Sequence, residues 1–191
     1  MFGRRLTEAI EEWIYFYSMT FDLQFDPQKI FSNIVLPKSR RGFDQIMLVP
    51  QGLTSGEVFD ASTDHFAISS IYEDLNSQVV NNDRDTITSY ALRLRDCQEP
   101  VRQNEMMLVK DLKDNDQIDC MTLLERLLYG LKFFIDTGAH LDEKLATFCV
   151  GSSDSQEQVP FVSTKNNGQV TIDRASLSSV DPTVLARQVI T

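Results

Sequence analysis

The feature that most constrains this chain is a long apolar helix, predicted for residues 119–136. Its apolar side chains recur at steps of three and four, which places them on one stripe of an α-helix: Met121, Leu124, Leu128, Leu131 and Ile135. Three further apolar residues widen the stripe, so that the solvent-facing set is reduced to Thr122, Glu125, Arg126, Tyr129, Lys132 and the two end aspartates. We expect this helix to be buried over much of its circumference and to organise the core.

Both ends of this helix carry recognisable signals. Asp119 is a suitable N-cap, because its carboxylate can accept from the free amides of the first turn, and Gly138 can adopt the left-handed conformation that ends a helix. Gly130 lies inside the helix, where glycine costs about 1 kcal/mol relative to alanine. Its presence predicts that a strand or another helix approaches closely at that point.

The length and composition indicate one globular domain, residues 1–191. Its 42% hydrophobic content excludes a disordered chain, and 191 residues are enough to bury a substantial core. The 28 acidic against 18 basic side chains give a net charge of −10, which repels nucleic acid and anionic lipid. We therefore expect neither nucleic acid nor membrane as a partner. A basic protein surface would be attracted, although the charge is also explained by solubility alone.

The cysteines and the N-terminus favour a cytoplasmic location. Cys97, Cys120 and Cys149 form no CxxC pair, and such a sparse, odd set fits a reducing compartment better than a disulfide framework or a zinc site. Glutamates interrupt the apolar run that an export signal would need near the N-terminus. No stretch approaches the roughly 20 uncharged apolar residues of a membrane span.

The remaining pattern predicts an α+β fold. We expect an amphipathic N-terminal helix over residues 4–18 anchored by Trp13, a short helix over residues 27–37, and a helix over residues 55–64 that begins with a capping box of Thr54 and Glu57. Strands are expected at residues 43–49, 67–72, 86–96 and 145–150, and in a hairpin of residues 159–163 and 169–173. These strands would form a mostly antiparallel sheet, packed on the central helix and the N-terminal helix.

Two local features complete this prediction. The hairpin signal is Asn167-Gly168, which is typical of a turn with positive φ at both central residues. The tail, residues 176–191, is expected either to hold a short helix beginning at Asp181 or to be flexible.

Arg93 and Arg95 are a candidate binding pair. Two residues apart on a strand, they would project from the same face about 7 Å apart, where two guanidiniums can hold a carboxylate or a phosphate. Asp96 follows directly and is a candidate acid or base. In an acidic chain, however, we favour a structural interpretation in which the arginines pair with the chain's own carboxylates.

His140 and Asp142 are the second candidate, because an imidazole beside a carboxylate suits a general base or a metal site. His65 is the only other histidine, so a site with several histidine ligands is excluded within one chain, and we expect no metal or cofactor. A histidine near a helix C-terminus is also favoured simply because its charged form offsets the end carbonyls. We prefer that structural interpretation.

Two further groups do not form recognisable sites. Ser152, Ser153 and Ser155 lack the second glycine of the GxSxG nucleophile pattern, and no glycine-rich nucleotide loop is present. Cys149 lies on an apolar strand, where a buried and inert thiol is expected.

Three segments together resemble a type of functionally uncharacterised bacterial protein: residues 89–100, 122–143 and 147–161. The resemblance covers the chain from Val49 onward at most. It implies a bacterial, soluble and compact protein, and it transfers no activity and no functional residue.

Two hypotheses for function follow. The first is a non-enzymatic binding or accessory protein of a bacterial cell or mobile element that acts through protein contacts. It rests on the acidic charge, the aromatic residues near the N-terminus and the lack of a complete catalytic constellation. The second is a small hydrolase or transferase that holds an anionic substrate on Arg93 and Arg95, with Asp96, His140 or Asp142 as acid and base. The second requires these side chains to converge in one pocket.

Overall fold

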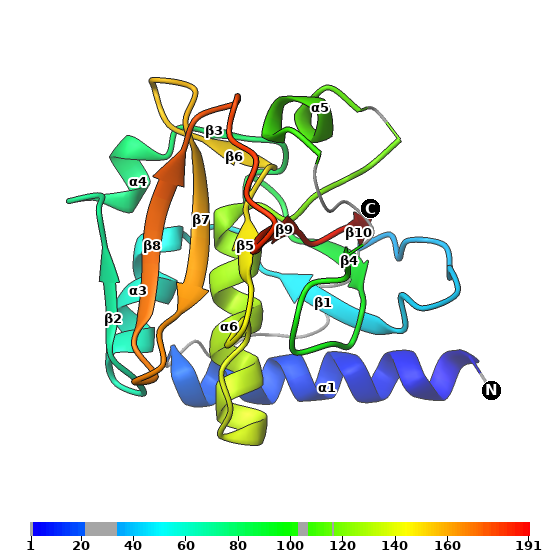
Figure 1. Cartoon of the computed structure of the whole chain (residues 1–191). Helices are drawn as coiled ribbons and strands as arrows, with labels where there is room; N and C mark the ends of the chain where they lie inside the picture. The colour runs from blue at the N-terminus through cyan, green and yellow to red at the C-terminus, as the bar shows by residue number, and fades with distance from the viewer. Residues whose placement is uncertain (1, 22–33, 103–106, 116) are drawn as a thin grey trace. The chain divides into compact units, whose positions relative to one another are not determined.

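The structure is a computed structural model, and it describes residues 2–21, 34–102, 107–115 and 117–191, with the side chains of residues 2–6 left out (Figure 1). Helices are combined with strands in mixed sheets, which confirms the predicted α+β class. The chain forms two compact units. The first comprises Met1–Leu53, Asp85–Asp96 and Ile190–Thr191, and the second comprises Thr54–Arg84 and Cys97–Val189.

The first unit is built on the helix α1 (Phe2–Thr20) and the antiparallel strands β1 (Gln45–Val49) and β4 (Tyr90–Leu94). The third strand of this sheet is β10 (Val189–Ile190), of which Ile190 is assigned to the first unit. Trp13 is buried, and its Nε1 donates to the carbonyl of Ile46 at 2.8 Å. The hydroxyl of Tyr17 donates to the carbonyl of Leu48. Trp13 is therefore the anchor of α1, as predicted.

The strands predicted for residues 43–49 and 86–96 are confirmed, with the shorter bounds of β1 and β4.

Residues 38–42, a cluster with three basic side chains, lie in a loop, and Gly42 has a φ of +83° there. The helix predicted for residues 27–37 lies mostly outside the described residues, and residues 34–37 carry no regular element.

The second unit contains a five-stranded mixed sheet in the order β2-β8-β7-β5-β9. Its strands are β2 (Ile68–Ser70), β5 (Ala146–Phe148), β7 (Val159–Thr164), β8 (Val170–Ala175) and β9 (Val184–Ala186). The β7 strand pairs antiparallel with β5 and β8, whereas the outer pairs β2–β8 and β5–β9 are parallel. A small antiparallel pair joins β3 (Asn81–Asn82) to β6 (Ser152–Ser153).

Four helices are described in this unit: α3 (Ser55–Thr63), α4 (Leu75–Gln78), α5 (Val109–Lys113) and α6 (Leu123–Thr137). Helix α3 begins with the predicted capping box of Thr54 and Glu57. Helix α6 is the predicted central helix, and it packs against α3 and β7. No helix in the described part of the chain is long and apolar enough to cross a membrane.

Helix α6 begins later than predicted. Its N-cap is Thr122, whose hydroxyl accepts from the amide of Glu125, while the Glu125 carboxylate accepts from the amide of Thr122 at 2.9 Å. The prediction of Asp119 as the cap is wrong, because residues 119–121 are extended and pair with the C-terminal segment: the amide of Met121 donates to the carbonyl of Arg187 at 3.0 Å. The predicted end is confirmed by Gly138, with a φ of +72°.

Three other predictions need correction. Thr122, Glu125, Arg126 and Tyr129 are buried and do not face solvent. The β7–β8 hairpin forms, but only Gly168 has a positive φ, so its turn is not of the expected type. The tail holds the strands β9 and β10 in place of a helix or a flexible end, because its apolar side chains, among them Leu185 and Val189, are buried.

The two capping boxes offer a matched test of burial. Thr122 is fully buried, whereas Thr54 is partly exposed, and both make the same pair of bonds with a glutamate three residues on. We expect Thr122→Ala to lower the free energy of unfolding by about 2 kcal/mol and Thr54→Ala by about 1 kcal/mol or less, because water replaces the lost bond only at the exposed cap. Urea denaturation measures both. Equal losses would contradict the role of burial.

Candidate functional site

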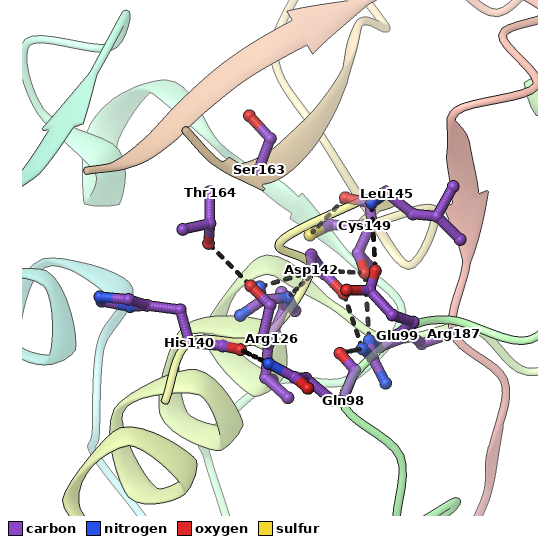
Figure 2. A network of polar contacts seen from close by, with 12 residues as sticks. Gln98, Glu99, Arg126, His140, Asp142, Leu145, Cys149, Ser163, Thr164 and Arg187 are labelled. Atoms are coloured by element: carbon purple, nitrogen blue, oxygen red, sulfur yellow. Dashed lines mark hydrogen bonds and ion pairs between the residues drawn. The ribbon is translucent and has the colours of Figure 1, made fainter. Parts of the chain in front are cut away.

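A network of buried polar side chains surrounds Asp142, in the turn that follows α6 (Figure 2). Asp142 is fully buried and has a φ of +57°, a left-handed conformation that is uncommon for a residue other than glycine. Its backbone is held in that conformation from two sides. The amide of Asp142 donates to the carbonyl of Gln98 at 3.1 Å, and its carbonyl accepts from the amide of Thr164 at 3.3 Å.

The carboxylate of Asp142 lies between two guanidinium groups (Figure 2). Its Oδ2 accepts from Nε of Arg126 at 2.8 Å and from the hydroxyl of Thr147 at 2.7 Å. Its Oδ1 accepts from Nη2 of Arg187 at 2.6 Å. Both arginine side chains are almost fully buried, so one carboxylate bridges two charges that have left water.

Arg187 also binds the backbone of Cys97 and Gln98, where the chain returns to the second unit. Its Nη1 donates to the carbonyl of Cys97 at 2.9 Å, and its Nη2 donates to the carbonyl of Gln98 at 2.6 Å. Its Nε donates to the hydroxyl of Thr147 at 3.1 Å. These oxygen atoms accept the hydrogen bonds of Arg187 that Asp142 does not, and a buried cation is stable only when its donors are satisfied in this way.

The side chain of Arg126 explains why residue 130, one turn later in α6, is a glycine. A Cβ built on Gly130 would lie 2.5 Å from Nη1 of Arg126. The prediction that a strand or another helix approaches this glycine is therefore wrong, because its nearest neighbour is a side chain of the same helix. Glycine makes room for the guanidinium that reaches Asp142.

These contacts decide what Asp142 can do chemically. Burial alone would raise its pKa, but the charges of Arg126 and Arg187 and the hydrogen bond from Thr147 bring the pKa below its usual value. A carboxylate held ionised in this way is a poor proton acceptor near neutral pH, since a general base works best with a pKa near the operating pH. The geometry therefore supports a structural role for Asp142.

A second charged pair lies at the start of α6. Nε of Arg84 donates to the carboxylate of Glu125 at 2.6 Å, and Glu125 is fully buried. Because Glu125 also caps the amide of Thr122, its two oxygens are used within the fold. Adjacent residues of α6, Glu125 and Arg126, thus each belong to a separate buried ion pair.

His140 does not form a dyad with Asp142 in this structure. Its ring contacts those of Phe66 and Phe134, with centroids 5.0 Å and 4.7 Å away, and Figure 2 shows it pointing away from Asp142. Burial lowers the pKa of His140, so its neutral form is favoured at neutral pH. A structural role stays the preferred interpretation, but its basis is aromatic packing and not a charge at the helix end.

Arg93, Arg95 and Asp96 belong to the first unit. Nε of Arg93 donates to the carbonyl of Pro37 at 2.9 Å, and the guanidinium of Arg95 lies over the ring of Phe43, 4.3 Å from its centroid. These contacts hold both arginines against their own unit. Asp96 is exposed. A role for any of the three in binding or catalysis stays a prediction.

Cys149 and Ser152 have structural contacts inside the second unit. Cys149 is fully buried, and burial raises the pKa of its thiol well above the usual value. The hydroxyl of Ser152 accepts from the amide of Leu123 at 2.8 Å and donates to the side chain of Asn82 at 2.6 Å. None of the three cysteines forms a disulfide. Within the described ranges, no group of three or more His, Cys, Asp or Glu side chains is placed to hold a metal ion.

Sequence reasoning missed the residues that complete this network, Arg187 and Thr147. Arg187 stands in the segment for which a short helix or a flexible end was expected, 45 residues from Asp142. One signal was available for Arg126, because Gly130 follows it by four residues on the same face of the helix and leaves space for a long side chain. Comparison with known proteins gives no match to a family model, to a curated protein or to a solved structure.

Replacing Asp142 tests the network directly. Asp142→Asn leaves two buried guanidiniums without an anion, and we expect it to lower the free energy of unfolding by about 3–5 kcal/mol at pH 7. Because the folded-state pKa of Asp142 is depressed, its contribution is present above the unfolded pKa of about 3.9 and is lost as the pH falls through the folded value.

Urea denaturation at several pH values between 7 and 2 measures both effects. The part of the acid sensitivity that comes from Asp142 should be absent in Asp142→Asn. The exposed Asp60→Asn is the matched control and should change stability by no more than about 0.5 kcal/mol. A loss in Asp142→Asn as small as in this control would contradict the network's importance.

Gly130→Ala tests the space that Arg126 needs. Alanine favours a helix by about 1 kcal/mol, but its methyl group would displace the guanidinium from Asp142, so we expect a net loss of about 1–3 kcal/mol. In an Arg126→Met background the same substitution should be neutral or stabilising. A double-mutant cycle by denaturation detects this change of sign, and additive effects would show that the guanidinium is not the obstacle.

Proposed function

We propose that this chain is a non-enzymatic accessory protein of a bacterial cell that acts in the cytoplasm by binding another protein. The observation that carries the proposal is an exposed face of α1 on which large apolar side chains lie beside glutamates. Tyr15 and Met19 are 67% and 68% exposed on this helix, and Glu11 and Glu12 are exposed on the same side. We call these four residues the α1 face.

The α1 face lies opposite the side that anchors the helix. Trp13, Phe16 and Tyr17 are buried, and Trp13 and Tyr17 donate to carbonyls of β1. An exposed tyrosine and methionine one turn apart are the side chains that protein interfaces favour. The adjacent carboxylates favour a partner with basic residues, because complementary charge steers association.

The bonding of the reactive groups also supports a binding role over an enzymatic one. Asp142 is held between two arginines, Cys149 is buried, and the hydroxyl of Ser152 accepts from the first amide of α6. The alternative, a small hydrolase or transferase that holds an anion on Arg93 and Arg95, is supported by their spacing alone. The cytoplasmic location is supported by three cysteines without a disulfide, and the bacterial origin by the resemblance of three segments.

Affinity capture from the source cells tests the proposal with a variant of the α1 face, Glu11→Lys/Glu12→Lys/Tyr15→Ser/Met19→Ser. We expect the unaltered chain to retain a protein partner and this variant to lose at least nine tenths of it, with an unchanged melting temperature. The control is Asp44→Lys/Ile87→Ser, which alters an exposed acid and an exposed apolar side chain elsewhere in the first unit and should retain the partner.

The same samples are screened against metabolites by thermal shift. A metabolite that raises the melting temperature, together with no captured partner, would favour the enzymatic alternative. Equal capture by the unaltered chain and the α1-face variant would place the binding surface elsewhere.

A further inference from the structure

Strand β2 forms one edge of the five-stranded sheet, paired only with β8 in that sheet (Figure 1). In a parallel pair, the peptide groups of alternate residues point to the neighbouring strand. The carbonyl of Ala67 accepts from the amide of Val170 at 2.9 Å, and the amide of Ile71 donates to the carbonyl of Ile172 at 3.0 Å. The peptide groups of Ile68 and Ser70 therefore point away from the sheet.

This outer edge is open in the described part of the chain. No backbone bond to another described residue is made there by the outward amides and carbonyls of Ile68 and Ser70. Proteins commonly protect such an edge with lysine, proline or a bulge, because unpaired peptide groups attract a further strand. Residues 67–71 have none of these: they contain no charge and no proline, and Ile71 beside the edge is 52% exposed.

The segment of the chain that contains β2 carries one sign of charge. Residues 54–83 include no lysine or arginine, whereas their acidic residues are all exposed: Glu57, Asp60, Asp64, Glu73, Asp74 and Asp83. Asp64 precedes β2 by four residues and Glu73 follows it by three. The uncharged strand β2 is thus flanked in the sequence by exposed carboxylates on both sides.

We infer that β2 receives an extended, lysine- or arginine-flanked segment of a partner protein, which adds a strand to the sheet. The outward peptide groups of Ile68 and Ser70 supply the backbone bonds, and an apolar side chain of the partner covers Ile71. Asp64 and Glu73 select for basic flanks. A second copy of this chain would bring the same carboxylates to the edge, so charge disfavours pairing of β2 with itself.

This inference does not rest on the α1 face. The two surfaces belong to different units, and a partner could use either alone. The strand-addition site also names a recognition mode, main-chain pairing, which the α1 face does not use.

Binding of a synthetic peptide tests the inference. The probe is a fluorescent eight-residue peptide with two lysines, a Val-Thr-Val-Thr core and two more lysines, and its affinity is measured by fluorescence anisotropy at 50 and 300 mM salt. Two control peptides are matched to it: one with N-methyl groups on alternate core amides, and one with glutamate in place of lysine. We expect both controls to bind at least tenfold more weakly.

Protein variants place the peptide. Ile68→Pro removes an outward amide at the first residue of an edge strand, a position that tolerates proline, and should weaken binding at least tenfold. Asp64→Lys/Glu73→Lys should weaken the lysine peptide and strengthen the glutamate peptide. The α1-face variant should bind the lysine peptide as the unaltered chain does, which separates this result from the fate of the proposed function.

The outcomes that would overturn the inference are distinct. Absence of binding overturns it, and so does binding that N-methylation leaves unchanged, which would show contact through charge alone. Sedimentation that reveals a dimer abolished by Ile68→Pro would assign the edge to a second copy. N-methylation alters only the peptide. The comparison of the two peptides on the unaltered chain therefore stays valid even if Ile68→Pro lowers the melting temperature.

Discussion

The bridge from Arg126 through Asp142 to Arg187 is the interaction on which the second unit depends. It joins a helix, the turn that follows it and the segment after β9, and its three charges are all buried. Removing an ion from water costs several kcal/mol, so each charge is acceptable in the interior only when its partners are in place. Helix α6, the turn and the C-terminal segment must therefore form together, which makes them one cooperative assembly.

Much of the remaining fold could be predicted from the sequence, because it depends on interactions between residues close together in the chain. A capping box needs only Thr54 and Glu57, and a helix stop needs only Gly138. The burial of Trp13 and the register of apolar residues in α6 follow from helical spacing, which no distant contact has to supply. These elements sufficed for the α+β class.

The parts that were not predicted depend on contacts between distant residues. Residues 119–121 are extended because they pair with residues 187–189, so Asp119 cannot cap the helix it precedes. Arg126 was assigned to solvent because an arginine in isolation is expected there, and its anion lies 16 residues away. Of the candidate site, the importance of the turn at Asp142 was anticipated. Its partners were not, since Arg126 and Arg187 lie 16 and 45 residues from Asp142 in the sequence.

Charge is distributed differently in the interior of the second unit and on its surface. The buried carboxylates Glu125, Asp142 and Asp154 each have an arginine partner, so the acidic excess of the chain is carried outside this interior. Within residues 54–83 the exposed carboxylates have no lysine or arginine of the same segment to balance them. Exposed like charges destabilise the compact state through mutual repulsion, and a basic partner relieves that repulsion on binding. The edge strand β2 lies within this same segment, so the charge there and the open edge both support our proposal of a basic partner.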